Sequence, residues 1–429
     1  MNRRIDRSIA RTIDWKLIAC YVALLLVGWV SIYASVHSTE PSSIFDLSSR
    51  CGKQFLWIMI SIVVGIGILF GVKPTLWEDL SIPAYLMVVA LLGVVLFFGT
   101  EVNGSKSWFV LGPVSFQPCE LSKITTSLVL AHFLRYSNFR FTNLRDAALI
   151  ITIIGIPALI ILAEGETGTL LVYVGYVFML YREGLSGWWL VFMIAAVVLF
   201  IMSIRFPLWV AFSVLGVVTL LCFLMTRRTL KRAAARRSLL RAAIMCLVAG
   251  SALIMSTNVV FNHVLKPHQQ TRIEVLLRMK EDPMGAGYNV NQSMIAIGSG
   301  GLTGKGFLQG TQTAYGFVPE QSTDFIFCTI GEEFGFVGCT IVILLFVYLI
   351  ARILKDAEEV REPFTRVYGY CLAGCIFMHL LINVGMTIGL MPVVGIPLPL
   401  ISYGGSSMLS FSVMIFIFLA LIRQERKYF

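Results

Sequence analysis

Apolar residues occur in blocks of about 20 along nearly the whole chain, and short polar segments separate the blocks. A helix needs about 20 apolar residues to cross the hydrocarbon core of a bilayer, so each block predicts a membrane-spanning helix. About twelve spans are predicted, at residues 16–36, 54–72, 81–99, 118–135, 146–163, 168–182, 188–204, 207–226, 241–262, 325–351, 366–390 and 405–423. The pattern therefore predicts an all-α polytopic integral membrane protein, with residues 1–429 forming a single transmembrane domain.

Composition supports this interpretation, because 57% of the residues are hydrophobic and only 14% are charged. A soluble domain needs more polar surface than this chain offers. Arginines precede the first span, and a strongly basic segment lies at 227–241. Cations favour the cytoplasmic side, which predicts cytoplasmic N- and C-termini. The net charge of +10 thus indicates contact with anionic membrane lipid, and nucleic acid is not expected as a partner.

Four polar segments stand out between the spans, at 103–118, 163–170, 263–324 and 391–407, and all are predicted to lie on the outer side. Irregular backbone at membrane depth is tolerated only where it contacts protein or lines a water-filled cavity. The longest of them, 263–324, is predicted to be a functional outer loop. Its first part, 263–283, has the pattern of a helix lying at the lipid interface.

Asp324 lies at the edge of the apolar run that begins at Phe325. It has two interpretations: an N-cap of the following helix, or a functional carboxylate, since charge at the membrane edge is costly. Glu332 and Glu333 lie about 12 Å deeper along a helix, which favours packing or a polar network.

Glu120 and Lys123 are spaced i, i+3 within a predicted span, so the two side chains can pair. The pair either holds neighbouring helices together or forms the polar wall of a cavity.

Common catalytic and nucleotide-binding motifs are missing. The run GSGGLTGKG lacks the spacing of a phosphate-binding loop, because Ser299 precedes Gly304 by five residues and Gly306 follows Lys305. Its glycines instead favour tight turns or close backbone approach. The five histidines match no metal-binding pattern, and no serine-hydrolase elbow is evident. Hydrolysis by a serine nucleophile is therefore not expected.

Six ordered blocks resemble the SEDS family of bacterial cell-wall proteins, the group of RodA and FtsW, and the resemblance extends over nearly the whole chain. The blocks are NGSKSWFVLGPVSFQPCELSK, DPMGAGYNVNQS, IAIGSGGLTGKGFLQGTQ, FVPEQSTDFIF, GEEFGFVG and GIPLPLISYGGSS. The stretch KGFLQGTQTAYGFVPEQ resembles the elongation-type RodA branch more than the division-type FtsW branch. Because the family usually has ten spans, the resemblance implies a two-helix insertion at 205–241.

The resemblance implies a peptidoglycan glycosyltransferase of the bacterial inner (cytoplasmic) membrane. Such proteins polymerise lipid II into glycan strands on the outer face during elongation and cell-shape maintenance. Their usual partner is a class B penicillin-binding protein, which crosslinks the strands. Two other functions stay open: a lipid II flippase, and a non-catalytic scaffold for the penicillin-binding protein.

The resemblance also implies a site. The family's essential acid falls on Asp324, which is the predicted catalytic base. Cations are expected to stabilise the departing pyrophosphate, with a divalent cation, Mg or Mn, as a candidate cofactor. No metal ligands are predicted. The candidate substrate-binding residues are Lys106, Glu120, Lys123, Arg272, Gln292, Lys305, Gln312, Glu320 and Ser402.

Four positions depart from the family's pattern. Ser322 stands where a histidine is common, Cys119 where a serine is common, Lys106 where an arginine is common and Glu166 where an aspartate is usual. These differences put in question any role that needs the usual side chains, but not the role of Asp324.

Overall fold

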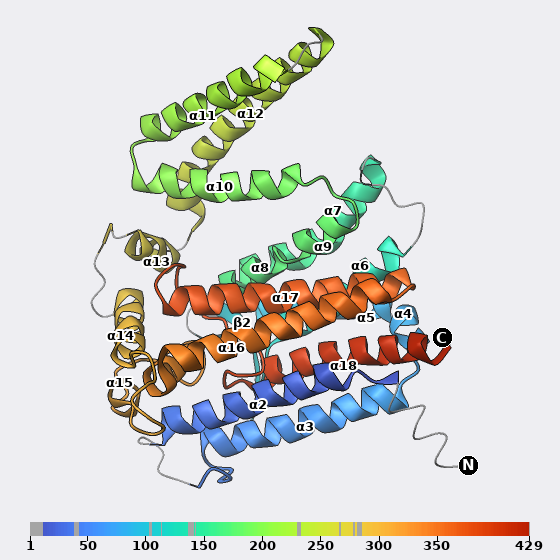
Figure 1. Cartoon of the computed structure of the whole chain (residues 1–429), viewed down its shortest axis with the longest axis vertical. Helices are drawn as coiled ribbons and strands as arrows, with labels where there is room; N and C mark the ends of the chain where they lie inside the picture. The colour runs from blue at the N-terminus through green and yellow to red at the C-terminus, as the bar shows by residue number, and fades with distance from the viewer. Residues whose placement is uncertain are drawn as a thin grey trace. The chain divides into compact units, whose positions relative to one another are not determined.

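Long apolar helices form most of the structure, as the hydrophobic pattern predicts (Figure 1). The computed structural model describes residues 12–37, 43–102, 105–112, 114–135, 141, 143–229, 233–265, 267–277, 279–280 and 285–428. Within this part, ten helices are long and apolar enough to cross a membrane. They are α2 (Trp15–Val36), α3 (Arg50–Gly71), α5 (Ser81–Phe98), α7 (Leu144–Glu164), α10 (Trp188–Arg205), α11 (Leu208–Thr229), α12 (Ala233–Val259), α16 (Ile326–Glu359), α17 (Pro363–Thr387) and α18 (Gly405–Tyr428).

The other two predicted spans are also helical, but they are shorter or broken. The predicted span 118–135 is α6 (Pro118–Leu134), a 17-residue helix whose side chains are mostly buried. The predicted span 168–182 consists of α8 (Thr167–Tyr173) and α9 (Tyr176–Arg182). Gly175 lies at the break, and a Cβ there would come within 2.7 Å of the carbonyl oxygen of Gly374. The backbones of α9 and α17 therefore approach closely, as small residues allow in membrane helices.

Polar caps fix where several helices begin. The Asp14 carboxylate accepts a hydrogen bond from the backbone N–H of Leu17 at 3.0 Å, at the start of α2. The Ser49 hydroxyl does the same for Gly52 at 3.2 Å, at the start of α3. These bonds satisfy N–H groups that have no partner in the first turn of a helix.

The structure adds a small sheet to the predicted all-helical fold. Strands β1 (Thr100–Val102), β2 (Ser105–Leu111) and β3 (Val114–Phe116) pair antiparallel in the order β1-β2-β3. Strands β2 and β3 lie in the predicted outer segment 103–118, and β1 directly precedes it. Trp108, Phe109 and Val110 of β2 have side chains that favour strands.

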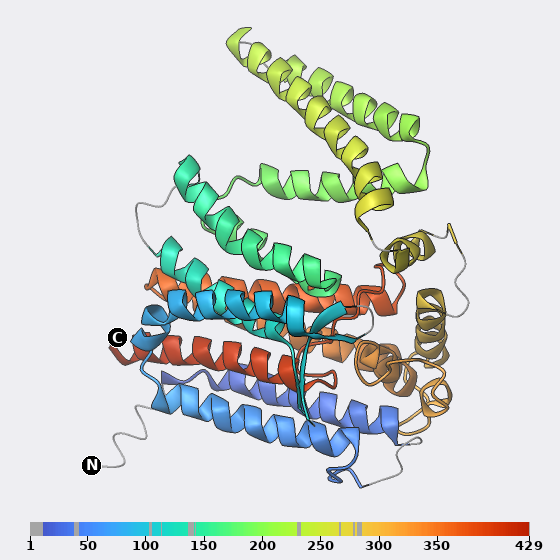
Figure 2. The same ribbon diagram turned by 180° about the vertical axis from the view of Figure 1, so that it is seen from behind.

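Helix α17 lies at the centre of the larger part of the chain, and most of its side chains are buried. It packs against α6, α9, α16 and α18, while α2 and α3 cover the far sides of α16 and α18 (Figures 1 and 2). Because α17 is surrounded by protein, its polar residues contact other parts of the chain. This packing brings polar groups of α17 to the predicted outer segments.

Helix α16 is broken near its beginning at Gly335, which has φ 63° and ψ −160°. A break inside a membrane helix leaves backbone groups without partners unless neighbouring backbone supplies them. Here the glycine-rich loop supplies them, through four hydrogen bonds of 2.9–3.1 Å: Lys305 N to Glu332 O, Gly306 N to Glu333 O, Phe336 N to Gly301 O and Val337 N to Leu302 O. The loop that precedes Asp324 is thus joined to the helix that follows it.

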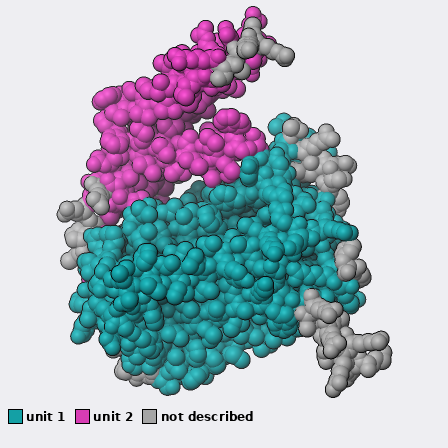
Figure 3. Space-filling view, in the orientation of Figure 1, with its two compact units in different colours: residues 1–185, 289–429 teal, residues 186–288 magenta. Residues whose placement is uncertain are grey.

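The chain divides into two compact units, residues 1–185 with 289–429, and residues 186–288 (Figure 3). The second unit contains α10, α11, α12, the π-helical turn Val260–Val264 and α13 (Pro267–Leu276). The predicted insertion 205–241 falls within this unit, on α11 and the start of α12.

The predicted interfacial segment 263–283 is helical over α13, and the predicted outer loop continues through α14 (Ala286–Ser299) and α15 (Thr311–Ala314). Parts of the basic segments, at 1–11 and 230–232, lie outside the described residues.

Candidate functional site

Asp324 follows a tight turn and directly precedes α16, but it does not cap this helix. The N-cap is Phe325, and no side chain caps it. The turn is closed by the backbone N–H of Phe325, which donates to the carbonyl of Glu320 at 3.2 Å, and Glu320 has a positive φ of 52°. The capping interpretation of Asp324 is therefore wrong. The Asp324 side chain is half-buried.

Asn383 of α17 and Ser402 of the uncharged segment 388–404 hold the backbone of residues 323 and 324. The amide of Asn383, near the end of α17, donates to the carbonyls of Asp324 and Ile396, at 2.8 Å each. The Ser402 hydroxyl donates to the carbonyl of Thr323 at 2.6 Å and accepts from Leu398 N at 2.8 Å. Side chains of α17 and of this segment thus fix the position of residues 323 and 324.

Gly395 approaches the carboxylate itself. It has φ +68°, and a Cβ there would lie 3.3 Å from Asp324 Oδ2. Glycine therefore serves two needs at this position, a left-handed backbone and close approach to a charged side chain.

Glu120 and Lys123 form a buried pair that reaches the same segment. Lys123 Nζ lies 2.9 Å from both Glu120 oxygens, and the Lys123 side chain is 0% exposed. The same ammonium lies 3.0 Å from Nε2 of His379, whose Nδ1 lies 3.0 Å from the carbonyl oxygen of Pro397. The pair joins α6 to α17, in line with the first interpretation, and extends a polar network to the carbonyl of Pro397. Its place in the wall of a cavity stays a prediction. In this conformation, Lys123 has no surface left for substrate.

Glu166 organises the strand segment. Its Oε1 accepts hydrogen bonds from the hydroxyls of Ser105 and Ser107 and from the amide of Gln117, at 2.7, 2.6 and 3.1 Å. One carboxylate oxygen thus joins the turn after α7 to both ends of the segment that carries β2 and β3. This is a structural task that glutamate performs here in place of the family's usual aspartate.

Glu332 is a loop anchor, although helix spacing places it deeper than Asp324. It accepts hydrogen bonds from the backbone N–H groups of Gln312 and Thr313 at 2.8 and 2.9 Å, and it pairs with Lys305 at 2.6 Å. The glycine-rich loop enters far enough to meet it. The predicted polar-network role of Glu332 is confirmed by these bonds. Glu333 accepts from Leu308 N at 3.1 Å.

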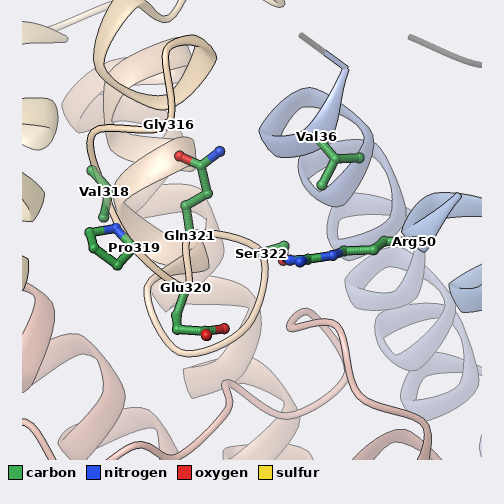
Figure 4. A pocket seen from close by; sticks show the side chains of 8 residues that line it. All are labelled: Val36, Arg50, Gly316, Val318, Pro319, Glu320, Gln321 and Ser322. Carbon is green, nitrogen blue, oxygen red and sulfur yellow. The ribbon is translucent and has the colours of Figure 1, made fainter. Parts of the chain in front are cut away.

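A pocket of about 350 Å³ opens beside the turn that leads to Asp324 (Figure 4). Its lining residues are Val36, Arg50, Gly316, Val318, Pro319, Glu320, Gln321 and Ser322. The Arg50 side chain extends from the start of α3 to the Ser322 hydroxyl, with Nη1 2.9 Å from Oγ. Ser322 is fully buried, and its carbonyl accepts from Tyr403 N at 2.9 Å. The serine that stands where a histidine is common thus accepts a hydrogen bond from an arginine.

The structure gathers only some of the predicted residues around Asp324. Glu320 belongs to the turn before Asp324, and Ser402 binds the carbonyl of Thr323 in that turn. Glu120 and Lys123 connect through His379 to Pro397 of the segment that contains Ser402. Lys305 and Gln312 are held by Glu332, and the exposed Lys106 donates to the carbonyl of Phe97 at 2.9 Å. Gln292 is half-buried on α14, and Arg272 belongs to the second unit on α13.

Sequence reasoning missed Arg50, His379 and Asn383. The last two carry a signal, since polar groups spaced i, i+4 in an apolar span mark a functional face. Arg50 carries none, because one arginine at the start of a span is ordinary. No group of three or more His, Cys, Asp or Glu side chains able to hold a metal ion occurs among the described residues. That part of the chain therefore does not fit a metal centre made of such ligands.

These features define a multi-pass helical membrane protein in which irregular polar segments hold one carboxylate beside a pocket. A family model described as cell cycle protein, for FtsW, RodA and SpoVE, matches residues 14–234 and 215–427. The chain belongs to this family.

Curated relatives agree with that assignment. The peptidoglycan glycosyltransferase RodA of Treponema pallidum is 32% identical over 92% of this chain and 94% of its own length. The peptidoglycan glycosyltransferase MrdB of Escherichia coli K12 is 30% identical over 92% and 90%. The probable peptidoglycan glycosyltransferase FtsW of Buchnera aphidicola is 28% identical over 94% and 92%. The sequence is thus more similar to these RodA-type relatives than to this FtsW.

Solved structures share the fold. A chain from a study of polymerization and crosslinking by a peptidoglycan synthase complex superposes with a TM-score of 0.68 at 25% identity, covering 96% of this chain and 98% of that chain. The rod shape determining protein RodA of Thermus thermophilus gives a TM-score of 0.60 at 23% identity, covering 96% and 97%.

Proposed function

We propose that this protein is a peptidoglycan glycosyltransferase that polymerises lipid II during cell elongation, at the outer face of a bacterial cytoplasmic membrane. The observation that carries the proposal is the setting of Asp324, a half-buried residue whose carbonyl is bound by Asn383, while Ser402 binds the preceding carbonyl of Thr323. The turn that leads to it lines a pocket. The RodA-type relatives, which bear this activity in their names, support it.

Asp324 acts as the general base. The acceptor sugar's 4-hydroxyl attacks the anomeric carbon of the donor, and its proton passes to the Asp324 carboxylate as the new C–O bond forms. The bond from the anomeric carbon to the lipid pyrophosphate breaks, and the pyrophosphate leaves with the bonding electrons. A pyrophosphate whose charge is stabilised needs no proton to leave, so a single carboxylate suffices.

Among the cations of the first unit, Arg50 is best placed to attract the pyrophosphate. It is exposed, it lines the pocket, and it donates to Ser322, which lies two residues before Asp324. Lys106 and Lys305 remain candidates for other contacts with the substrate, and Arg272 stays a candidate from the sequence alone. Lys123 acts through the buried network. A divalent cation, Mg or Mn, would enter with the pyrophosphate, and no step above depends on it.

A class B penicillin-binding protein is the proposed partner. The support is the similarity to a chain studied within a peptidoglycan synthase complex that couples polymerization and crosslinking. A polymerase of glycan strands requires a crosslinking activity nearby, which fits such a partner.

The test is polymerisation of lipid II by the purified chain, with products resolved on a gel. The wild type should make polymer, and Asp324→Asn should lower the rate at least about 100-fold while folding normally. Asp79→Asn is the control, because Asp79 is an exposed carboxylate on α4 (Thr75–Asp79), at the other end of the helices. Polymer from Asp324→Asn at the wild-type rate would refute the assignment. Movement of labelled lipid II across vesicles without any polymer would favour a flippase instead.

A further inference from the structure

We propose that His379 is a positioning residue that sets the place of the Asp324 carboxylate by tying the buried Lys123 to segment 395–398. The inference rests on the proposed function. It assigns His379 a state, the neutral imidazole with its proton on Nδ1, and a task, holding the backbone that packs against the base.

The two neighbours of the imidazole determine this state. The ammonium of Lys123 only donates hydrogen bonds, so Nε2 of His379, 3.0 Å away, accepts. The carbonyl of Pro397 only accepts, so Nδ1, also 3.0 Å away, donates. A doubly protonated ring would place an N–H against the ammonium, with two positive charges in contact. Only the Nδ1-protonated neutral ring satisfies both neighbours.

The network has no access to water. Lys123 is 0% and His379 1% exposed, and Phe411 closes the remaining side, with its ring centroid 4.7 Å from Lys123 Nζ and 4.9 Å from the His379 ring. Water therefore cannot replace a lost hydrogen bond here. A buried polar group deprived of its partner must move or remain unsatisfied.

His379 and Asn383 act on consecutive carbonyls. They are spaced i, i+4 on α17 and therefore lie on one face of the helix. Asn383 binds the carbonyl of Ile396, and His379 binds the carbonyl of Pro397. Pro397 itself has no N–H, so side chains hold this part of the segment in place of a regular backbone ladder. Two adjacent contacts from one rigid helix fix both the position and the twist of the segment.

This segment lies against the base. Gly395 precedes the clamped pair, and its Cα faces Asp324 Oδ2 closely enough that a Cβ would lie 3.3 Å from that oxygen. Asn383 holds the backbone of Asp324 with the same amide that holds Ile396. Loss of the His379 contact would leave Asn383 alone to hold the segment. The carboxylate would then lose a fixed wall without losing its own backbone contact.

Two substitutions separate this role from simple packing. Glutamine has an amide oxygen that can accept from Lys123 and an NH₂ group that can donate to Pro397, so His379→Gln can restore both bonds. Leucine is of similar size but makes neither. His379→Leu should lower kcat about tenfold with little change in KM for lipid II, because a small misplacement of a base affects the chemical step. His379→Gln should recover most of the rate.

The experiment measures steady-state polymerisation of lipid II by the full-length wild type, His379→Leu and His379→Gln, each checked for a monodisperse, folded state. Hydrogen–deuterium exchange of the segment 391–403 is the second readout, and it should rise in the leucine variant and stay low in the glutamine variant. If His379→Leu does not fold, His379→Met replaces it.

Equal kcat in an active wild type and the leucine variant would overturn the proposal, as would equal losses in the leucine and glutamine variants. An inactive wild type would instead sink the proposed function. In that case, hydrogen–deuterium exchange of residues 391–403 in the leucine and glutamine variants still tests whether His379 holds the segment.

Discussion

Lys305 Nζ lies 2.6 Å from Glu332 Oε1, so a cation of the glycine-rich loop pairs with a carboxylate inside a membrane helix. The Glu332 side chain is 0% exposed, whereas Lys305 keeps 26% of its surface. The pair closes the loop onto α16 near the break at Gly335. Lys305 therefore has a structural partner, whatever contact it makes with a substrate.

A double-mutant cycle should detect this pairing as stability. Lys305→Met leaves the Glu332 charge without a cation, and Glu332→Gln removes the charge but keeps the shape. We expect each single change to lower the melting temperature, and the pair to be coupled by about 0.5–3 kcal/mol. The melting temperatures of the wild type, the two single variants and the double variant are measured by thermal unfolding in detergent. Additive effects of the two changes would show that the pair contributes nothing.

Gly395→Ala should reduce polymerisation about tenfold or more, because the new methyl group would lie 3.3 Å from Asp324 Oδ2 and displace the base. Gly112→Ala is the matched control. Gly112 has a similar φ of +64°, but a Cβ there would meet nothing within 4 Å. Both variants place alanine at a similar positive φ, so the control accounts for the backbone strain. Only Gly395→Ala should lower the rate. Similar rates for the two would contradict direct contact between Gly395 and the base.

Glu166→Ala should loosen the strand segment. Three donors, from Ser105, Ser107 and Gln117, lose their shared acceptor, at a cost of about 1–3 kcal/mol for the buried ones. Hydrogen–deuterium exchange should rise across 105–116 and remain unchanged in α18. Glu166→Gln keeps one oxygen acceptor, so its exchange should lie between those of the wild type and the alanine variant. No change in the alanine variant would mean that the pairing of β2 with its neighbours alone orders the segment.

Asp14 makes stability dependent on pH at the other end of the helices. Burial would raise the pKa of this carboxyl group. Hydrogen bonds from Arg352, Asp356 and the backbone of Leu17, with the charge of Arg352, outweigh burial and lower the pKa to about 2. A lowered folded-state pKa gives stability that is present above the unfolded-state value of 3.8 and is lost as the pH falls through 2.

The corresponding variant is Asp14→Asn. Near neutral pH it should be less stable than the wild type by about 2 kcal/mol. The difference should persist to about pH 4 and shrink below it, as the wild-type carboxylate takes up its proton. Melting temperatures of the two proteins between pH 7 and pH 3 provide the measurement. A difference that disappears already between pH 7 and pH 5 would contradict a lowered pKa at Asp14.

The spans were predictable because apolar length is a local property of the sequence. All twelve predicted spans are helical in the structure, including α6, which contains Glu120 and Lys123. The break between α8 and α9 was not predictable. It depends on the close approach of Gly175 to Gly374, two glycines that the chain places far apart.

The site was predictable for residues that lie in recognisable blocks and unpredictable for those defined by contacts. Asp324 follows from its block, and the structure removes its capping role by starting α16 after Phe325. Spacing along a straight helix placed Glu332 about 12 Å deeper than Asp324 and favoured a polar network, but it did not show that the outer loop supplies the partners of Glu332. Arg50 joins the pocket only because α3 begins beside Ser322.

The break at Gly335 also determines how movement passes along α16. An unbroken helix would act as a stiff rod between the ion pairs of Arg352 with Asp14 and Asp356 at one end of the bundle and Asp324 at the other. Here the stack of helical hydrogen bonds is interrupted one turn below Glu332, and the two halves are joined through the backbone of residues 301–306. A tilt of the long half would therefore reach the Asp324 end through the hydrogen bonds between α16 and the glycine-rich loop, so substitutions in this loop should change how strongly the two ends of α16 are coupled.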